Sequence, residues 1–173
     1  MLAVASLGIF TATYARYVSQ AEETGTVSVA AWGAGATLEA LSIDVSDLTP
    51  GTQKTYSFQV TNTKDGKISQ VAQTYAFTIE TTENLPLVFS LSSTGSVPEG
   101  GGTAMAVPGG ALAFVGGKAE LDGGILPHTV PATHKYELSV SWPEDEDARL
   151  SDYADEIDLV TLTVKADQMI PTS

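Results

Sequence analysis

The stretch Tyr136-Glu137-Leu138-Ser139-Val140-Ser141-Trp142 decides the fold of this chain. Its apolar side chains fall on every second residue, and a polar side chain separates each from the next. Successive side chains of a β-strand point to opposite faces of a sheet, so a period of two predicts a strand with one buried face. The same alternation recurs along the chain at Val27–Ala31, Tyr56–Val60, Tyr75–Ile79, Leu87–Leu91 and Val160–Val164.

Turn-forming residues stand between these predicted strands. Pro50-Gly51, Asp65-Gly66 and Asn84-Leu85-Pro86 interrupt the alternating runs with residues that favour tight turns. Six half-buried strands separated by turns are typical of two antiparallel sheets packed face to face. The sequence therefore predicts an all-β fold, an antiparallel β-sandwich.

Glycine pairs mark a separate region of the chain. They stand at positions 101/102, 109/110, 116/117 and 123/124, which are seven or eight residues apart. Glycine accepts positive φ angles without steric cost, so the spacing predicts short strands joined by Gly-Gly hairpin turns. A calcium-binding nonapeptide array would need an Asp in every repeat, and this region offers only Asp122. We therefore expect a hairpin insertion in the sandwich at about residues 100–124.

Composition and charge exclude several classes of function. The chain has 173 residues, enough for one domain with its own core, and contains 21 Asp plus Glu against 8 Lys plus Arg, a net charge of -13. Such a charge repels phosphate backbones and anionic lipids, so we expect no nucleic-acid partner and no membrane binding by charge. Cysteine is absent, which excludes disulfides, thiol nucleophiles and cysteine-bound metals.

The first residues differ in character from the rest of the chain. Residues 2–14 carry no charge, and the first charged side chain is Arg16. A run of this length is too short to span a bilayer but fits the apolar core of a secretory signal. Thr13 and Ala15 supply small residues at the positions that precede a cleavage site, so residues 1–15 are predicted to be removed between Ala15 and Arg16. A helix buried in the folded domain is the alternative interpretation.

No arrangement of residues in the sequence predicts catalysis. The histidines, His128 and His134, lie six residues apart without the helical i, i+4 spacing of a zinc protease. We interpret them as exposed loop residues. The glycine-rich segments lack the Lys-Ser/Thr of a phosphate-binding loop, and no serine stands on a nucleophile elbow. We therefore expect a protein that is not an enzyme and that needs no cofactor.

An acidic run is the strongest electrostatic feature of the sequence. Eight carboxylates and a single base, Arg149, lie between Glu144 and Asp158. Clustered carboxylates are ligands for Ca²⁺, and the residues that could hold it are Asp145, Asp147, Asp152 and Asp155. Their spacing does not match that of an EF-hand loop, and the main interpretation is a solvated connection between the last two strands.

Several motifs together resemble the TasA/camelysin family of surface and biofilm-matrix fibre proteins, which depend on a SipW-type signal peptidase. The resemblance covers most of the chain outside the glycine-pair region. Its cleavage-region motif is Ala12–Ser19, and its first strand begins at Thr26. The strand-turn-strand signature is Leu48-Thr49-Pro50-Gly51 followed by Tyr56–Asn62, and the last strand ends at Gln168. Some family members have been linked to proteolysis, but this sequence supplies no zinc ligands for it.

The resemblance implies a jelly-roll subunit that assembles head to tail. The mature N-terminal arm, residues 16–29, would add as a strand to the sheet of the next copy in a homopolymer, with Tyr17, Val18, Val27 and Val29 as its anchors. Residues 30–168 would form the jelly-roll-like sandwich and residues 169–173 a short tail. The implied location is extracellular, at the surface or in the biofilm matrix of a Gram-positive bacterium. An accessory protein could anchor the filament, and the chain would meet a membrane only during export.

Three other interpretations stay open at this stage. The arm could be the first strand of its own sandwich. Residues 1–15 could be retained as a core helix of a pilin-like filament. The chain could also be a monomeric adhesin or carbohydrate-binding module, for which Trp32 and Trp142 would be the sugar platforms. An unfilled sheet edge nevertheless favours polymerisation, because a heterologous contact that does not close propagates into a fibre.

Overall fold

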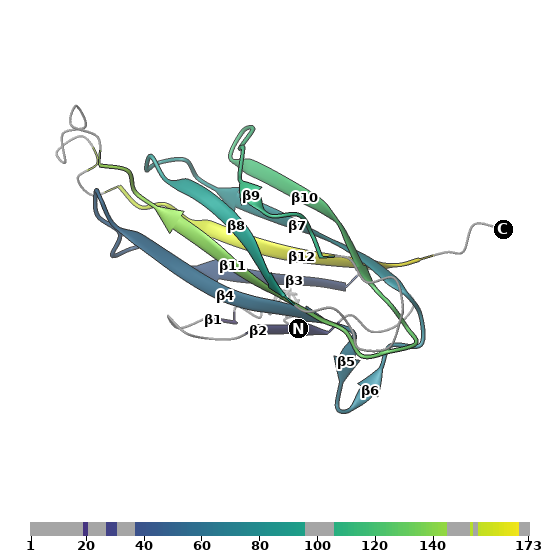
Figure 1. The fold of residues 1–173 in the computed structure, drawn as a ribbon. Helices are drawn as coiled ribbons and strands as arrows, with labels where there is room; N and C mark the ends of the chain where they lie inside the picture. Colours follow the sequence, from purple (N-terminus) through teal and green to yellow (C-terminus); the bar gives the residue numbers. More distant parts are fainter. Residues whose placement is uncertain are drawn as a thin grey trace, which may run out of the picture.

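A computed structural model describes residues 19–20, 27–30, 37–95, 106–144, 153 and 156–169 of the chain. The described residues form β-strands joined by turns and loops (Figure 1). The strands are β1 (Ser19–Gln20), β2 (Val27–Ala30), β3 (Thr37–Ile43), β4 (Gln53–Thr61), β5 (Thr63–Lys64), β6 (Lys67–Ile68), β7 (Gln73–Thr81), β8 (Val88–Gly95), β9 (Gly110–Ala111), β10 (Lys118–Leu126), β11 (Thr133–Ser141) and β12 (Val160–Gln168).

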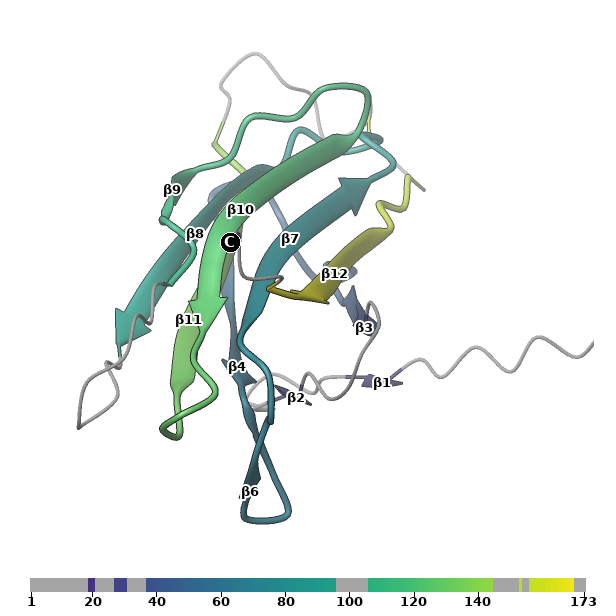
Figure 2. The same ribbon diagram turned by 90° about the vertical axis from the view of Figure 1, so that its right-hand side faces the viewer.

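The strands build two packed sheets and a small hairpin. Sheet A has the order β1-β3-β12-β7-β10, and sheet B has the order β2-β4-β11-β8-β9. From β3 onward the chain changes sheet at almost every step, which gives the topology of a jelly roll. The β5–β6 hairpin projects beyond one end of both sheets (Figure 2). The predicted all-β antiparallel sandwich is therefore confirmed.

The period of two explains which faces are buried. The predicted apolar runs at Tyr56–Val60, Tyr75–Ile79, Tyr136–Trp142 and Val160–Val164 place their alternate residues in the core between the sheets. Residues such as Phe77, Leu138 and Leu162 are fully buried. At the centre, the Tyr136 ring stacks on Phe58 of the same sheet at 5.2 Å between centroids. The Phe77 ring of the opposite sheet packs edge to face with Tyr136 at 4.8 Å between centroids. Edge-to-face and offset pairs of this kind are favourable beyond the area that they bury.

The glycine pairs have different roles from those expected. Gly116–Gly117 forms a hairpin turn with positive φ angles of 59° and 73°, as predicted. Gly123–Gly124 does not turn the chain. This pair lies at an irregularity within β10, between Leu121 and Gly124, and β10 is a full strand of sheet A rather than part of an insertion. Positions 101/102 lie outside the described residues.

Gly124 is required because it packs against an aromatic ring. A Cβ added to Gly124 would lie 2.4 Å from the Tyr75 ring, whereas one added to Gly116 would meet nothing within 4 Å. We expect Gly124→Ala to lower the free energy of unfolding by about 2–3 kcal/mol, the cost of overpacking a core. Gly116→Ala serves as a control that introduces only the cost of a positive φ angle, about 1 kcal/mol. Urea denaturation of both variants measures the difference, and equal losses would contradict the steric explanation.

Candidate functional site

The N-terminal strands lie on the edges of the two sheets. β1 pairs with β3 at the edge of sheet A, and β2 pairs with β4 at the edge of sheet B. Both pairings are parallel, although every other pairing among the described strands is antiparallel. The edges of β3 and β4, two strands that follow each other in the chain, form the candidate functional site.

The register of β2 matches the buried face of its neighbour. Val27 lies opposite Phe58, and Val29 lies opposite Val60. Phe58 is 4% exposed and Val60 is fully buried, so Val27 and Val29 occupy register positions of the core-facing set. Tyr17 and Val18, the other two predicted anchors, and the predicted cleavage site at Ala15 and Arg16 lie outside the described residues.

The hydrogen bonds at these edges are few. β1 contributes two residue pairs with β3, and β2 contributes four with β4. By comparison, β11 pairs with β4 over nine residues. β2 adds backbone hydrogen bonds and the two apolar positions of Val27 and Val29 to an edge of β4 that would otherwise be open. This is the chemistry of strand addition, in which main-chain hydrogen bonds give affinity and alternate side chains give specificity.

The acidic run is only partly described, and one of its members differs from expectation. The four predicted Ca²⁺ ligands Asp145, Asp147, Asp152 and Asp155 lie outside the described residues. The sequence predicts that Asp158 is one of the solvated carboxylates, but its side chain is buried and only 5% exposed. Its Oδ1 accepts hydrogen bonds from the Thr81 hydroxyl at 2.6 Å and from the Thr82 backbone N–H at 3.0 Å.

These bonds give Asp158 a structural role. They fasten the start of β12 to the end of β7, which explains why one carboxylate of the run is buried. Asp158 Oδ2 has no hydrogen-bond partner within the described part of the chain. In the same part, no group of three or more His, Cys, Asp or Glu side chains is placed to hold a metal ion.

The prediction of two exposed loop histidines is wrong for His134. His128 is exposed, but His134 lies in β11 and is 2% exposed. Its Nδ1 lies 2.5 Å from the Tyr75 hydroxyl, which also bonds the Tyr136 hydroxyl. The Tyr136 oxygen in turn accepts the backbone N–H of Val107 at 2.8 Å. The sequence places His134 in a Pro- and Thr-rich stretch, and only the period of two with Tyr136 could have indicated its burial.

Burial sets the ionisation of this network. It lowers the pKa of His134 and raises the pKa of Tyr75 and of Tyr136, because each charged form would lose its water. We assign the proton of neutral His134 to Nε2, so that Nδ1 accepts the Tyr75 hydroxyl proton and the Tyr75 oxygen accepts that of Tyr136. Protonating Nδ1 would reverse the first bond and leave one of the two tyrosine hydroxyl hydrogens without an acceptor in the network. Protonation of His134 in the folded chain would therefore weaken this network.

This arrangement predicts a loss of stability in mild acid. The pKa of His134 is lower in the folded than in the unfolded chain, so below about pH 6.5 the unfolded chain binds the extra proton first. We expect the free energy of unfolding to fall as the pH decreases from 7.5 to 5.5. His134→Gln should show a shallower fall and His128→Gln the wild-type one. Urea denaturation across this range measures both, and parallel curves for all three proteins would contradict the role of His134.

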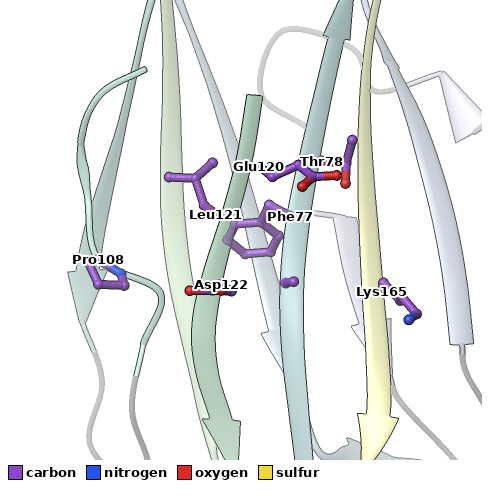
Figure 3. Close-up of a pocket in the computed structure, with 8 residues that line it drawn as sticks. Phe77, Thr78, Pro108, Glu120, Leu121, Asp122 and Lys165 are labelled. Carbon is purple, nitrogen blue, oxygen red and sulfur yellow. The ribbon is translucent and has the colours of Figure 1, made fainter. Parts of the chain in front are cut away.

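A shallow depression of about 460 Å³ lies beside the β10 irregularity (Figure 3). Ala76, Phe77, Thr78, Pro108 and Leu121 line it together with charged side chains. Two of these charges are already paired, because Lys118 contacts Glu120 at 2.6 Å and Lys165 contacts Asp167 at 3.0 Å. The depression is open and its charges are mostly neutralised, so we assign it no ligand.

Trp142 does not form a sugar platform. It is 7% exposed, and its ring meets Tyr153 edge to face at 5.7 Å between centroids. Trp32, the other predicted platform, lies outside the described residues. Of the two tryptophans predicted to bind a sugar, the structure describes Trp142, and this one is buried. The carbohydrate-binding interpretation is therefore not supported by Trp142.

No model of a known protein family matches this chain, and no curated protein matches it in sequence. The class that the structure defines is an all-β sandwich with its N-terminal strands on the sheet edges. The part of the chain that the structure describes contains no helix with the length and apolar character needed to cross a bilayer.

Proposed function

We propose that this chain is an exported structural subunit that polymerises into filaments at the cell surface or in the biofilm matrix of a Gram-positive bacterium. The resemblance to the TasA/camelysin family implies the fibre role, and the proposal that the chain acts without catalysis rests on the missing zinc ligands and nucleophile elbow in the sequence. The main partner of the chain is a second copy of itself, and an accessory protein anchors the filament. The chain meets a membrane only during export.

One observation carries this proposal: the parallel addition of β2 to the edge of β4. The four-residue segment Val27–Ala30 fits the edge in a register that continues the buried set of Phe58 and Val60. The same segment of a neighbouring copy can make the same hydrogen bonds with the same register. Exchange of an identical element between copies costs little free energy, because the contacts are conserved.

The order of the exchanging parts along the chain supports a filament as the proposed assembly. The donated segment precedes the sandwich in the chain, while the accepting edge belongs to the sandwich itself. Each copy therefore uses two different surfaces, and such heterologous contacts propagate when the rotation between copies does not close. Removal of residues 1–15 would free Arg16 as the first residue of the arm and release the arm for donation.

The processing step can be tested by the intact mass of the protein recovered from the cell surface. We expect a chain that begins at Arg16, because signal peptidase cleaves after small residues such as Ala15. A mass that still contains residues 2–14 would contradict the cleaved arm. It would favour the pilin-like filament, in which that segment is retained.

The strand-donation step can be tested by placing a charge on the arm. Val27→Asp with Val29→Asp puts carboxylates at register positions of buried Phe58 and Val60, so we expect assembly to need at least about tenfold more protein. Ser28→Asp is the matched control, since Ser28 lies at the intervening position opposite Gln59. Sedimentation and electron microscopy at increasing concentration measure assembly.

Deletion of residues 16–29 should abolish filaments while leaving a folded monomer. Strand-rich circular dichroism and an unchanged core would show that the sandwich still folds. Filaments of wild-type yield from the deletion variant would overturn the proposal. So would a wild-type protein that stays monomeric at every concentration.

A further inference from the structure

The two ends of the sandwich differ in charge. β4 and β8 begin at one end, where β7 and β11 finish, and the β5–β6 hairpin projects from the other (Figure 1). Several strands have nine residues, so about 30 Å separates the ends at roughly 3.3 Å per residue. We call the first the acidic end, defined by Glu83, Glu144 and Glu156, and the second the hairpin tip, defined by Lys64 and Lys67.

The hairpin tip is a tight turn with a net positive charge, two lysines against the single carboxylate of Asp65. Asp65 and Gly66 have φ angles of 50° and 74°, the positive pair that a tight two-residue hairpin turn requires. Lys64 and Lys67 are exposed and lie directly opposite each other in the pairing of β5 with β6. Like charges directly opposite each other destabilise a strand pair. Neither lysine forms an ion pair within the described residues, so an anionic partner would relieve this repulsion.

The base of the hairpin is fixed by a buried side chain. Asn62 is fully buried, and its backbone carbonyl accepts the Ser69 N–H at 2.8 Å across the hairpin base. The Asn62 amide donates to Val130 O at 2.9 Å, and its Oδ1 accepts the Ala132 N–H at 2.8 Å. These bonds join the hairpin base to the loop before β11. The two lysines therefore project from the sandwich in a defined direction.

The acidic end combines carboxylates with exposed apolar side chains. Glu83, Glu144 and Glu156 are exposed and form no ion pair within the described residues. Val115, Ile157 and Leu159 are 84%, 66% and 65% exposed. They flank the end of β7, because Thr81 N–H bonds Gly117 O at 2.8 Å and the Asn84 amide bonds Ile157 O at 2.6 Å. Exposed apolar residues within a charged rim are typical of a protein–protein contact.

We propose that the acidic end binds the β5–β6 hairpin of a second copy, as the end-to-end contact of the assembly. This inference rests on the proposed function, which makes the neighbour an identical chain. Lys64 and Lys67 of one copy would face Glu83 and Glu156 of the next. Strands β5 and β6 of the first copy would cover the exposed apolar side chains at the acidic end of the second. A contact between opposite ends is heterologous and aligns the copies in one direction. The charges of this contact would set the orientation of the two copies and the rate at which they associate, and added salt would weaken the contact.

Charge reversal tests this contact. Lys64→Glu with Lys67→Glu places carboxylates against carboxylates, and Glu83→Lys with Glu156→Lys places ammonium groups against ammonium groups. We expect each variant alone to need at least about tenfold more protein to assemble, since facing like charges cost several kcal/mol. An equimolar mixture of the two variants should assemble again, because each end then meets an opposite charge on the other variant. Light scattering and sedimentation at low salt measure this.

Matched controls separate the contact from net charge. Lys135→Glu with Lys165→Glu changes the net charge as much as the hairpin variant, but on the sheet faces. Glu120→Lys with Glu137→Lys does the same for the acidic-end variant. Each control also breaks one exposed ion pair, Lys165–Asp167 or Lys118–Glu120, which contributes little at a surface, so both should assemble like the wild type. Equal impairment of the controls, or a mixture of reversed variants that stays monomeric, would overturn the inference.

The outcome is distinguishable from failure of strand donation. If the hairpin variant assembles like the wild type while deletion of residues 16–29 abolishes filaments, the end-to-end contact is wrong and the proposed function stands. If the deletion variant assembles like the wild type while the charge variants fail and recover on mixing, strand donation is wrong and the end-to-end contact stands.

Discussion

The position of Tyr136 between the two sheets is the interaction on which the rest of the structure depends. Its ring stacks on Phe58 and meets the edge of Phe77, so one side chain joins both layers of the core. Its hydroxyl accepts the Val107 N–H and bonds Tyr75, which in turn bonds His134. A buried hydroxyl without partners would cost free energy, so packing and hydrogen bonding at this residue must be satisfied together.

The fold could be predicted because apolar alternation is a local signal. Tyr136, Leu138 and Val140 are all buried, as their period of two requires. The alternation does not indicate which strands pair with each other, because a strand of either sheet shows the same period of two. The glycine pairs illustrate this limit. Gly116–Gly117 turns the chain, whereas Gly123–Gly124 lies within β10, where a Cβ on Gly124 would meet the Tyr75 ring.

Long-range hydrogen bonds explain what the sequence could not indicate about the site. Val27 and Val29 have the alternation of an edge strand, but their parallel register with Phe58 and Val60 depends on a contact across about thirty residues. Asp158 is the last member of the acidic run, a context that favours exposure to solvent. Its burial results from Thr81 and Thr82, which are far away in the chain. His134 is buried for a similar reason, since Tyr75 comes from the opposite sheet.

The two sides of the sandwich handle their open edges differently. On one side, β10 pairs only with β7 among the described strands, and its edge contains an irregularity and the charges of Lys118, Glu120 and Asp122. Bulges and charges of this kind protect an edge strand from pairing with another chain. On the other side, the edges of β3 and β4 carry the short parallel strands β1 and β2. In the proposed filament, strands are exchanged only at the edges of β3 and β4, so strand donation is confined to one side of each copy. The opposite charges of the two ends would fix the direction in which the copies align.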